Sequence, residues 1–321
     1  MLNLSLGLYL TGRNGLSNRV RIVVADDGVT PAMADVESGD TIADAFPATS
    51  LDTANYEVVG DETDSILYVT REWSLNGEEW QTVESDLAAI VAADGSAGWF
   101  DPSDLSTIFQ DSAGTTAITA DGDPTGLFQD KSGNGYHYSQ STAAARPTYK
   151  TDGTYHWIQS DGVDDTLTAL HRFGLAANPN LTVSVAVEAI SVATFDTLLT
   201  IGSGTGNLGI GLDGTGQGWK FSGGNAYFGA VSTGTPVVLS YVRSAGSTYA
   251  ASRGFLNGVE RSQTSVANPT GVPTQTGAVS AMIPDDTPNV KIFGMVVQNT
   301  ADSSKREAAE AWLAGKCGVT L

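Results

Sequence analysis

Short runs of alternating residues, separated by turn residues, recur along the chain and constrain its fold more than any other feature. Examples are "RVRIVVA", "SILYVTREW", "LTVSVAVEAI", "TPVVLSYVRS" and "NVKIFGMVVQ". Successive side chains of a strand point to opposite faces of a sheet, so an alternating run predicts a strand with one buried face. Many such runs, punctuated by Gly, Ser and Thr, predict an all-β protein.

Two Asn-Gly pairs predict tight hairpins, because both residues tolerate the positive φ angles of a two-residue turn. Asn76-Gly77 lies in "SLNGEEW", and Asn257-Gly258 lies in "FLNGVE". The leucines at even positions from Leu2 to Leu10 also alternate, which predicts a first strand.

The length of 321 residues predicts two domains at roughly 150 residues each. An Ala-rich stretch with Gly and Ser, at residues 87–98, places the boundary near residue 92. Residues 1–92 are predicted to form an immunoglobulin-like β-sandwich with Trp73 and Trp80 around a hairpin. Residues 93–321 then form the second domain.

One longer helix is predicted at the C-terminus, in "ADSSKREAAEAWLAGKCGVTL". Ser304 and Glu307 fit a capping box, and Gly315 can end the helix. The predicted apolar face consists of Ala308, Ala311 and Trp312.

The charge pattern restricts the possible partners. The formal net charge is -20, from 16 basic and 36 acidic residues, so the protein repels phosphate backbones and anionic membranes. We therefore expect neither nucleic-acid binding nor membrane insertion. The single cysteine, Cys317, excludes an intrachain disulfide, and three scattered histidines disfavour a histidine-rich metal centre.

Residues 99–318 resemble the laminin-G-like, concanavalin-A-like jelly-roll domains of bacteriophage and prophage proteins. The resemblance rests on "WFDPSDLSTIFQ", on "DKSGNGYHY" followed by "SDGVDD", on the late hairpin "FLNGVE" and on the closing "KREAAEAWLAGKCGV". The sequence departs from that family at Thr166, where an aromatic residue is usual. The resemblance implies a jelly-roll sandwich with a short C-terminal helix, which would follow the immunoglobulin-like sandwich predicted for residues 1–92.

The same resemblance implies a non-enzymatic surface protein of a bacteriophage virion, of the tail-fibre, tail-tip or head-fibre type. Its N-terminal domain would contact other virion proteins, and its lectin-like domain would adhere to host surface polysaccharide as a homo-oligomer. Because the start of the chain lacks signal-peptide features, the virion surface is the expected location. The alternatives are a structural decoration or fibre-base protein without glycan binding, and a secreted glycan-active enzyme.

Glycan binding would need an aromatic face and fixed polar groups. The stretch "GQGWKFSGGNAYFGA" offers Trp219, Asn225 and Tyr227. The alternative is that Trp219, Phe221 and Phe228 fill the core of the sandwich.

The stretch "DKSGNGYHY" has Asp130, Ser132 and Asn134 at the spacing of a calcium loop. Ser141 occupies the twelfth place, where a helix-loop-helix site needs a bidentate acid, so that kind of site is rejected. A looser calcium site would use Asp130 and Asn134 with Asp121 or Asp123; otherwise the stretch is a tight turn. A second acidic turn places Asp161, Asp164 and Asp165 where they could hold a cation or lie exposed.

Catalytic signatures are weak. Glycoside hydrolysis needs two carboxylates on opposite sides of the scissile bond, and no predicted strand carries such a pair. Glu188 stands alone in its strand, and Ser203 lacks the surroundings of a nucleophile elbow. We therefore expect no enzymatic activity.

Overall fold

In the computed structural model, the chain divides into two compact units, Met1–Gln81 and Thr82–Leu321. The structure describes residues 20–26, 30–36, 58–60, 67–69, 74–75, 78–79 and 83–321, except 192–195, 203–207, 214–217, 222–225, 268, 273–276, 278 and 285–287. The division falls before the predicted boundary near residue 92, because a helix just before that boundary packs on the second unit.

In the first unit, three antiparallel strand pairs are described. They are β1 (Val20–Asp26) with β2 (Thr30–Val36), β3 (Val58–Gly60) with β4 (Leu67–Val69), and β5 (Ser74–Leu75) with β6 (Glu78–Glu79). The strands on either side of Asn76-Gly77 therefore pair as predicted. The immunoglobulin-like arrangement remains a prediction, and the expected leucine strand at residues 2–10 lies outside the described residues.

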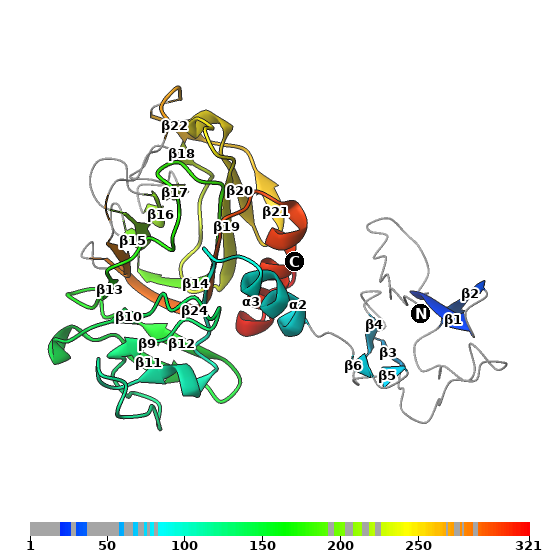
Figure 1. Ribbon diagram of the computed structural model, residues 1–321, viewed down its shortest axis with the longest axis horizontal. Helices are drawn as coiled ribbons and strands as arrows, with labels where there is room; N and C mark the ends of the chain where they lie inside the picture. Colours follow the sequence, from blue (N-terminus) through cyan, green and yellow to red (C-terminus); the bar gives the residue numbers. More distant parts are fainter. Residues whose placement is uncertain are drawn as a thin grey trace. The chain divides into compact units, whose positions relative to one another are not determined.

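The second unit is a sandwich of two antiparallel sheets (Figure 1). In the described residues, one sheet has ten strands in the spatial order β22 (Ser265–Val266), β18 (Ala226–Tyr227), β17 (Gly218–Phe221), β16 (Leu208–Asp213), β15 (Asp196–Ile201), β23 (Ser280–Met282), β13 (Leu167–Ala169), β10 (Tyr138–Ser139), β9 (Leu127–Phe128) and β8 (Ile108–Phe109). The other has eight, β11 (Thr148–Thr151), β12 (His156–Gln159), β24 (Asn289–Gln298), β14 (Leu181–Ser191), β19 (Val237–Arg243), β20 (Arg253–Leu256) and β21 (Val259–Arg261), with β7 (Gly98–Phe100) paired to β24. Among the described residues of this unit, three single 3-10 turns connect strands, at Leu105–Thr107, Ala143–Ala145 and Tyr249–Ala251.

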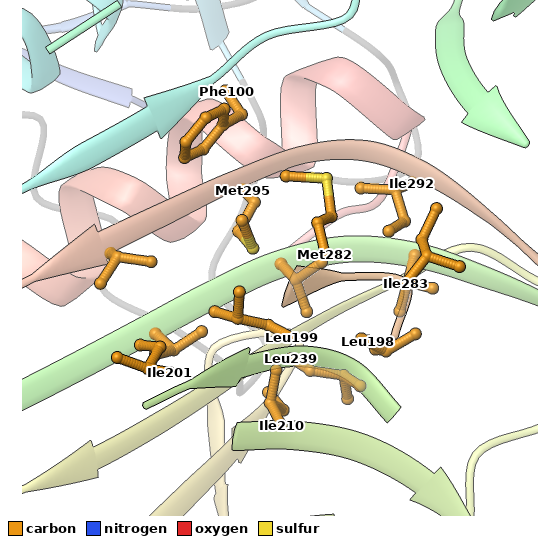
Figure 2. Close-up of a cluster of buried hydrophobic side chains, with 14 of the residues drawn as sticks. Phe100, Leu198, Leu199, Ile201, Ile210, Leu239, Met282, Ile283, Ile292 and Met295 are labelled. Atoms are coloured by element: carbon orange, nitrogen blue, oxygen red, sulfur yellow. The ribbon is translucent and has the colours of Figure 1, made fainter. Parts of the chain in front are cut away.

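The main core fills the space between the two sheets (Figure 2). Leu199 and Ile201 of β15 and Ile210 of β16 meet Met295 and Ile292 of β24 in this layer. Leu199 and Ile201 are two positions apart, as strand alternation requires, whereas Ile292 and Met295 are three apart because β24 has a register shift at Phe293. The predicted all-β class is confirmed.

A second, smaller core lies on the other face of the eight-stranded sheet. Helices α2 (Val83–Ala92) and α3 (Ser303–Cys317) cover that face, and Trp312 packs there against Trp99 of β7 at 5.4 Å between ring centroids. Gly294 of β24 permits this close approach, since a Cβ atom there would lie only 3.0 Å from Leu313. The helices therefore close one outer face of the sandwich.

Two local predictions need correction. Residues 83–92 form α2, which overlaps the stretch 87–98 that was expected to be a junction, because Leu87 and Val91 are buried in the layer between helix and sheet. At the C-terminus, Asp302 rather than Ser304 caps α3, accepting from the backbone N–H groups of Ser304 and Lys305. The helix ends at Gly318, not Gly315, where φ is 71°.

The second predicted hairpin is confirmed. Asn257 (φ 49°) and Gly258 (φ 74°) join β20 to β21, and both have the positive φ angles that a two-residue turn requires.

Candidate functional site

The outer face of the ten-stranded sheet presents a cross-strand row of small residues. The registers pair Ser139 with Thr168, Thr168 with Ala281, Ala281 with Thr200, and Thr200 with Gly209. At about 4.8 Å between neighbouring strands, the row spans ~19 Å across β10, β13, β23, β15 and β16. We call these five residues the small-residue row.

Strand alternation determines on which face of the sheet the small-residue row lies. Its strand neighbours Tyr138, Leu167, Met282, Leu199 and Ile210 belong to the core between the sheets. The row therefore lies on the opposite face, and the helices α2 and α3 pack on the other sheet. Thr168 is exposed, while Ser139 and Thr200 are half-buried, so three hydroxyl groups line this face.

A buried polar pair lies on the same face, one row away. Tyr227 of β18 alternates with the core residues Ala226 and Phe228, and Asp213 of β16 follows the core residue Leu212. Tyr227 is 5% exposed and Asp213 is 6% exposed. Burial raises the pKa of Tyr227, and the charge of Asp213, which accepts a hydrogen bond from the Tyr227 hydroxyl, raises it further.

This arrangement can bind hydroxylated ligands. The threonine and serine hydroxyls donate and accept hydrogen bonds, and a carboxylate held by a tyrosine is a fixed acceptor. Gly209 and Gly211 of β16 carry no side chain, and Gly211 is paired with the half-buried Thr197. Sugars are the ligand class that matches a flat track of hydroxyls beside a carboxylate.

The predicted glycan-binding residues have different outcomes. Tyr227 lies on this face, but its buried side chain holds Asp213 and offers no exposed stacking surface. Trp219 lies on β17 with its backbone paired to Leu212, and Asn225 lies outside the described residues. Asp213 and the small-residue row were not predicted from the sequence. The sequence signal that could have identified Asp213 and Gly209 is the alternation in "LGIGLD", where glycine and aspartate alternate with core residues.

The other outer face offers a half-buried tryptophan, Trp157 of β12. Its indole N–H donates to Gln159 at 3.1 Å, and the ammonium of Lys291 lies 5.1 Å from its ring centroid. Lys291 in turn pairs with Glu188 at 2.8 Å. Because a protein cation already lies over this ring, we do not assign it a ligand.

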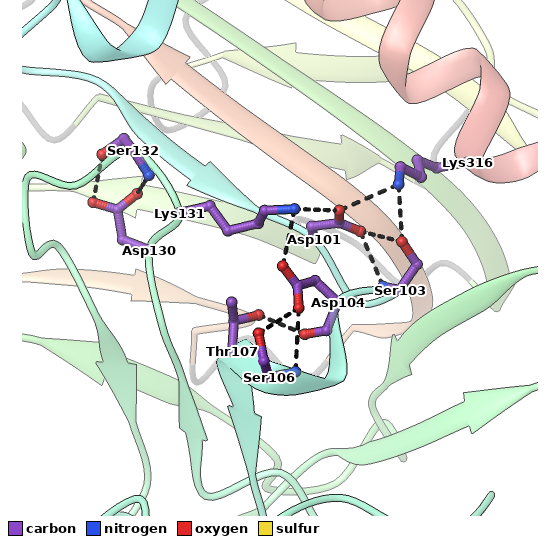
Figure 3. A network of polar contacts seen from close by, with 9 residues as sticks. All are labelled: Asp101, Ser103, Asp104, Ser106, Thr107, Asp130, Lys131, Ser132 and Lys316. Atoms are coloured by element: carbon purple, nitrogen blue, oxygen red, sulfur yellow. Dashed lines mark hydrogen bonds and ion pairs between the residues drawn. The ribbon is translucent and has the colours of Figure 1, made fainter. Parts of the chain in front are cut away.

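The calcium-like stretch forms what we call the Asp130 turn, residues 130–136 (Figure 3). The Asp130 carboxylate accepts hydrogen bonds from the backbone N–H groups of Trp99 (2.9 Å), Ser132 (2.9 Å) and Tyr136 (3.1 Å) and from the Ser132 hydroxyl (2.7 Å). The Asn134 amide donates to the carbonyls of Asp94 and Ala97. The turn therefore fastens the segment between α2 and β7 to the sandwich.

Asp121 and Asp123, predicted as additional calcium ligands, belong to other contacts. Asp123 accepts from the backbone N–H groups of Thr119 and Ala120, and these hydrogen bonds lower its pKa. Asp121 pairs with Lys150 at 2.8 Å, and that contact lowers its pKa. The calcium site built from Asp130, Asn134, Asp121 and Asp123 stays a prediction.

The acids that gather most closely among the described residues form what we call the Asp165 turn, residues 160–165. Ligand oxygens of Asp161, Asp164 and Asp165 all lie within 4.8 Å of one another. Burial, with the charges of Asp161 and Asp164, raises the pKa of Asp165 to about 6, against an ordinary 3.8. The cluster can hold a cation, or one protonated carboxyl beside two ionised ones.

A network of two lysines anchors the end of α3 (Figure 3). The buried Asp101 accepts from Lys131 at 3.0 Å and from Lys316 at 3.2 Å. Although burial alone would raise the pKa of Asp101, the Ser103 hydrogen bond and the two lysine charges lower it. The network joins β7, the Asp130 turn and α3, so its role is structural.

No helix in the described part of the chain is long and apolar enough to cross a membrane.

Comparisons with known proteins give structural neighbours only. No family model matches the chain, and no curated protein matches it. Among solved structures, a GH54 α-L-arabinofuranosidase has a TM-score of 0.49 at 12% identity, covering 72% of this chain and 65% of its own. Domain 4 of a GH43 arabinanase from Geobacillus stearothermophilus, in complex with arabinotriose, has 0.41 at 17% identity, covering 59% of this chain and all of its own.

A sialidase from Trypanosoma rangeli has a TM-score of 0.42 at 15% identity and covers 94% of this chain, which spans about half of the sialidase's length (49%). These three neighbours are carbohydrate-related β proteins, and none of the three is a bacteriophage or laminin-G protein. The prediction of a non-enzymatic virion adhesin is contradicted by this finding, because the three neighbours come from glycoside hydrolases. The expectation that the chain is no enzyme is contradicted in the same way.

Proposed function

We propose that the sandwich of the second unit binds carbohydrate, as a recognition module of a glycan-active protein. The observation that carries the proposal is the Tyr227–Asp213 pair, a buried carboxylate and tyrosine on the outer face of the sheet that α2 and α3 leave free. The Tyr227 hydroxyl holds the Asp213 carboxylate in place, and a fixed carboxylate can accept hydrogen bonds from sugar hydroxyls.

The small-residue row extends this pair into a track. Its ~19 Å length and three hydroxyls suit several sugar units of an extended chain. Gly209 is required by the packing of β16 on β15, since a Cβ atom there would lie only 2.5 Å from the carbonyl oxygen of Leu199. The laminin-G-like family assignment of residues 99–318 belongs to this proposal, on the sequence features that suggested it.

Binding is tested on the full chain with soluble polysaccharides, by affinity electrophoresis and calorimetry. Thr168→Trp places an indole in the middle of the row, where Thr168 is exposed, and we expect at least ~10-fold weaker binding. The matched control is Thr154→Trp, in an exposed turn of the eight-stranded sheet, which should bind like the wild type. Tyr227→Phe removes only the hydroxyl that holds Asp213, so binding should weaken while the fold persists.

Two results would overturn the proposal. One is the absence of binding to every polysaccharide tested; the other is unchanged binding in Thr168→Trp. The same samples are assayed for released reducing sugar. Release by the wild type that Thr168→Trp leaves intact would place the active chemistry away from this face.

A further inference from the structure

Two exposed apolar side chains lie at the ends of strands in the ten-stranded sheet. Leu170 directly follows β13 and is 90% exposed, and Val279 directly precedes β23 and is 41% exposed. Leu170 is the most exposed large hydrophobic side chain in the part of the chain that the structure describes. Isolated exposed leucines are ordinary, so the neighbours of Leu170 decide whether it has a role.

Strand register places these two side chains next to each other on the outer face. The ladder between β13 and β23 ends at the pair of Ala169 with Ser280. The residues just beyond this pair, Leu170 and Val279, therefore lie opposite each other. Because Ala169 belongs to the core between the sheets, and Ser280 opposite it is fully buried, alternation turns the next residue of each strand to the outer face. The small-residue row lies on the same face.

An exposed histidine lies on the other side of Leu170. Strands β10 and β13 pair at Ser139, and the same register brings Tyr136 beside His171, with 4.9 Å between ring centroids. His137, the next residue after Tyr136, therefore lies beside Leu170, and it is exposed. Tyr136 packs against the core, so alternation turns His137 outward. We call His137, Leu170 and Val279 the Leu170 row.

The hydrogen bond that His137 makes determines which ring nitrogen can donate to a ligand. Its Nδ1 accepts from the backbone N–H of Asp130 at 3.0 Å, so the proton of the neutral ring is on Nε2. The exposed ring therefore carries an N–H donor beside an apolar side chain.

The Leu170 row runs alongside the small-residue row. Leu170 is two residues from Thr168, and Val279 is two residues from Ala281, which is a step of about 6.5 Å along each strand. At about 4.8 Å between neighbouring strands, the Leu170 row spans about 10 Å. A sugar ring bound at Thr168 would therefore place one of its substituents over Leu170.

An acetyl group matches an apolar surface next to an N–H donor. Its methyl group gains from contact with aliphatic side chains, and its carbonyl oxygen accepts a hydrogen bond. We propose that this face selects acetylated glycans, with the acetyl methyl group on Leu170 and Val279 and the carbonyl oxygen accepting from His137. The inference rests on the proposed function, since it names the ligand class of the same site. O-acetyl esters and N-acetyl amides share this chemistry, and the experiment distinguishes them.

The test compares matched ligands on the full chain by calorimetry. O-acetylated xylo-oligosaccharides are paired with the same sample after alkaline deacetylation, and tri-N-acetylchitotriose is paired with cellotriose, which has a hydroxyl in place of each acetamide. We expect the acetylated member of at least one pair to bind at least ~10-fold more tightly than its partner. A preference in the first pair alone assigns the ester, and a preference in the second pair alone assigns the amide.

Substitutions at Leu170 test the apolar contact directly. Leu170→Ser removes the side chain that the methyl group would contact, so it should bring the affinities for the two members of a pair together. Leu170→Met keeps an apolar side chain and should retain the preference. The matched control is Val163→Ser, at a valine of the Asp165 turn that is 68% exposed, and it should keep the wild-type preference. Because Leu170 is exposed, urea denaturation should give wild-type stability for both Leu170 variants.

The outcomes separate the two proposals. Equal binding of both members in both pairs, or a preference that Leu170→Ser leaves intact, would overturn the inference and leave carbohydrate binding standing. A wild-type dimer in light scattering that Leu170→Ser dissociates would assign the Leu170 row to a contact between two copies of the chain, and would also overturn the inference. A wild-type chain that binds neither member of any pair would overturn the proposed function itself.

Discussion

The Asp130 turn and the Asp165 turn are built from the same residue types but put them to opposite uses. Each holds a buried aspartate and at least one glycine with positive φ. In the first, the Asp130 carboxylate accepts hydrogen bonds from three backbone N–H groups and one hydroxyl. In the second, the Asp165 carboxylate accepts one from Asp161 and shares its space with two further carboxylates.

Aspartate-rich turns of similar composition can therefore have different roles. The surroundings decide whether the carboxylate organises the backbone or remains available for a proton or a cation. Sequence spacing pointed to calcium at the Asp130 turn, yet the acids that converge are those of the Asp165 turn. Substitutions at five positions test this difference between the turns, and they follow in order of expected effect.

Removal of the Asp130 carboxylate should have the largest effect. Asp130→Ala leaves the N–H groups of Trp99 and Ser132 without their acceptor in a buried place, where each unsatisfied donor costs about 1–3 kcal/mol. We expect a loss of about 3–5 kcal/mol in the free energy of unfolding, measured by urea denaturation of the full chain. Asp130→Asn retains one acceptor oxygen and should lose less. Equal stability of wild type and Asp130→Ala would contradict the structural role.

Asp165→Asn should raise the free energy of unfolding at neutral pH, whereas Asp130→Ala lowers it. A pKa of about 6 against an ordinary 3.8 means that the folded state binds this proton more tightly than the unfolded state. The ionised carboxylate therefore destabilises the fold above pH 6, and that penalty is relieved as the pH falls from about 6 towards 4. At about 1.36 kcal/mol per pKa unit it amounts to about 3 kcal/mol at neutral pH.

The measurement is urea denaturation between about pH 4 and pH 7.5. We expect Asp165→Asn to be more stable than the wild type at neutral pH and equal to it near pH 4. The Asn side chain can still accept from the N–H of Asp161, so the turn is retained. A difference that does not change with pH would contradict the raised pKa.

Replacing a glycine in each turn by alanine should destabilise the two turns by different amounts, because the room for an added Cβ atom differs between them. Gly133 has φ 85°, and a Cβ atom added there would meet no other atom within 4 Å, so Gly133→Ala should cost only the backbone strain, about 1 kcal/mol. Gly162 has φ 78°, and a Cβ atom there would lie 3.1 Å from the Cβ of Asn289. We expect Gly162→Ala to lower the free energy of unfolding by about 2 kcal/mol, measured by thermal denaturation. A larger loss in Gly133→Ala than in Gly162→Ala would contradict the packing of the Asp165 turn on β24.

Asp164→Asn should have the smallest effect, a slight fall in the pKa of Asp165. Burial is the main cause of the raised pKa of Asp165, and the charge of Asp164 is a lesser one. NMR titration of the Asp165 carboxyl carbon should show a pKa that falls slightly and stays above its ordinary value. A return to the ordinary value would make charge crowding, rather than burial, the dominant cause.

The sequence predicts much of the fold, since its periodicity is local. Alternation marks the strands of both sheets, and Asn257-Gly258 is sufficient to place a hairpin. The helix α2 escaped prediction because its amphipathic character is weak and a Gly/Ser stretch follows it. The cap of α3 was misplaced by two residues because Asp302 and Ser304 are both good N-cap residues.

The candidate site is predicted less well, because it depends on register between strands far apart in the chain. Tyr227 could be selected as a polar aromatic, but its contact with Asp213 needs the order β16, β17, β18. Likewise, Ser139 and Gly209 become members of one row only when five strands are aligned. Composition and spacing carry no information about that alignment.

The position of β24 has a consequence for the synthesis of the protein. This strand follows every other described strand of the second unit in the sequence, yet it lies between β12 and β14 and also pairs with β7, the first described strand of that unit. The α2 helix likewise contacts α3, which follows β24. The sandwich therefore cannot close while β24 is still inside the ribosome. A nascent chain halted before residue 289 would present unpaired strand edges on β12, β14 and β7, which are exposed to chaperones until β24 arrives.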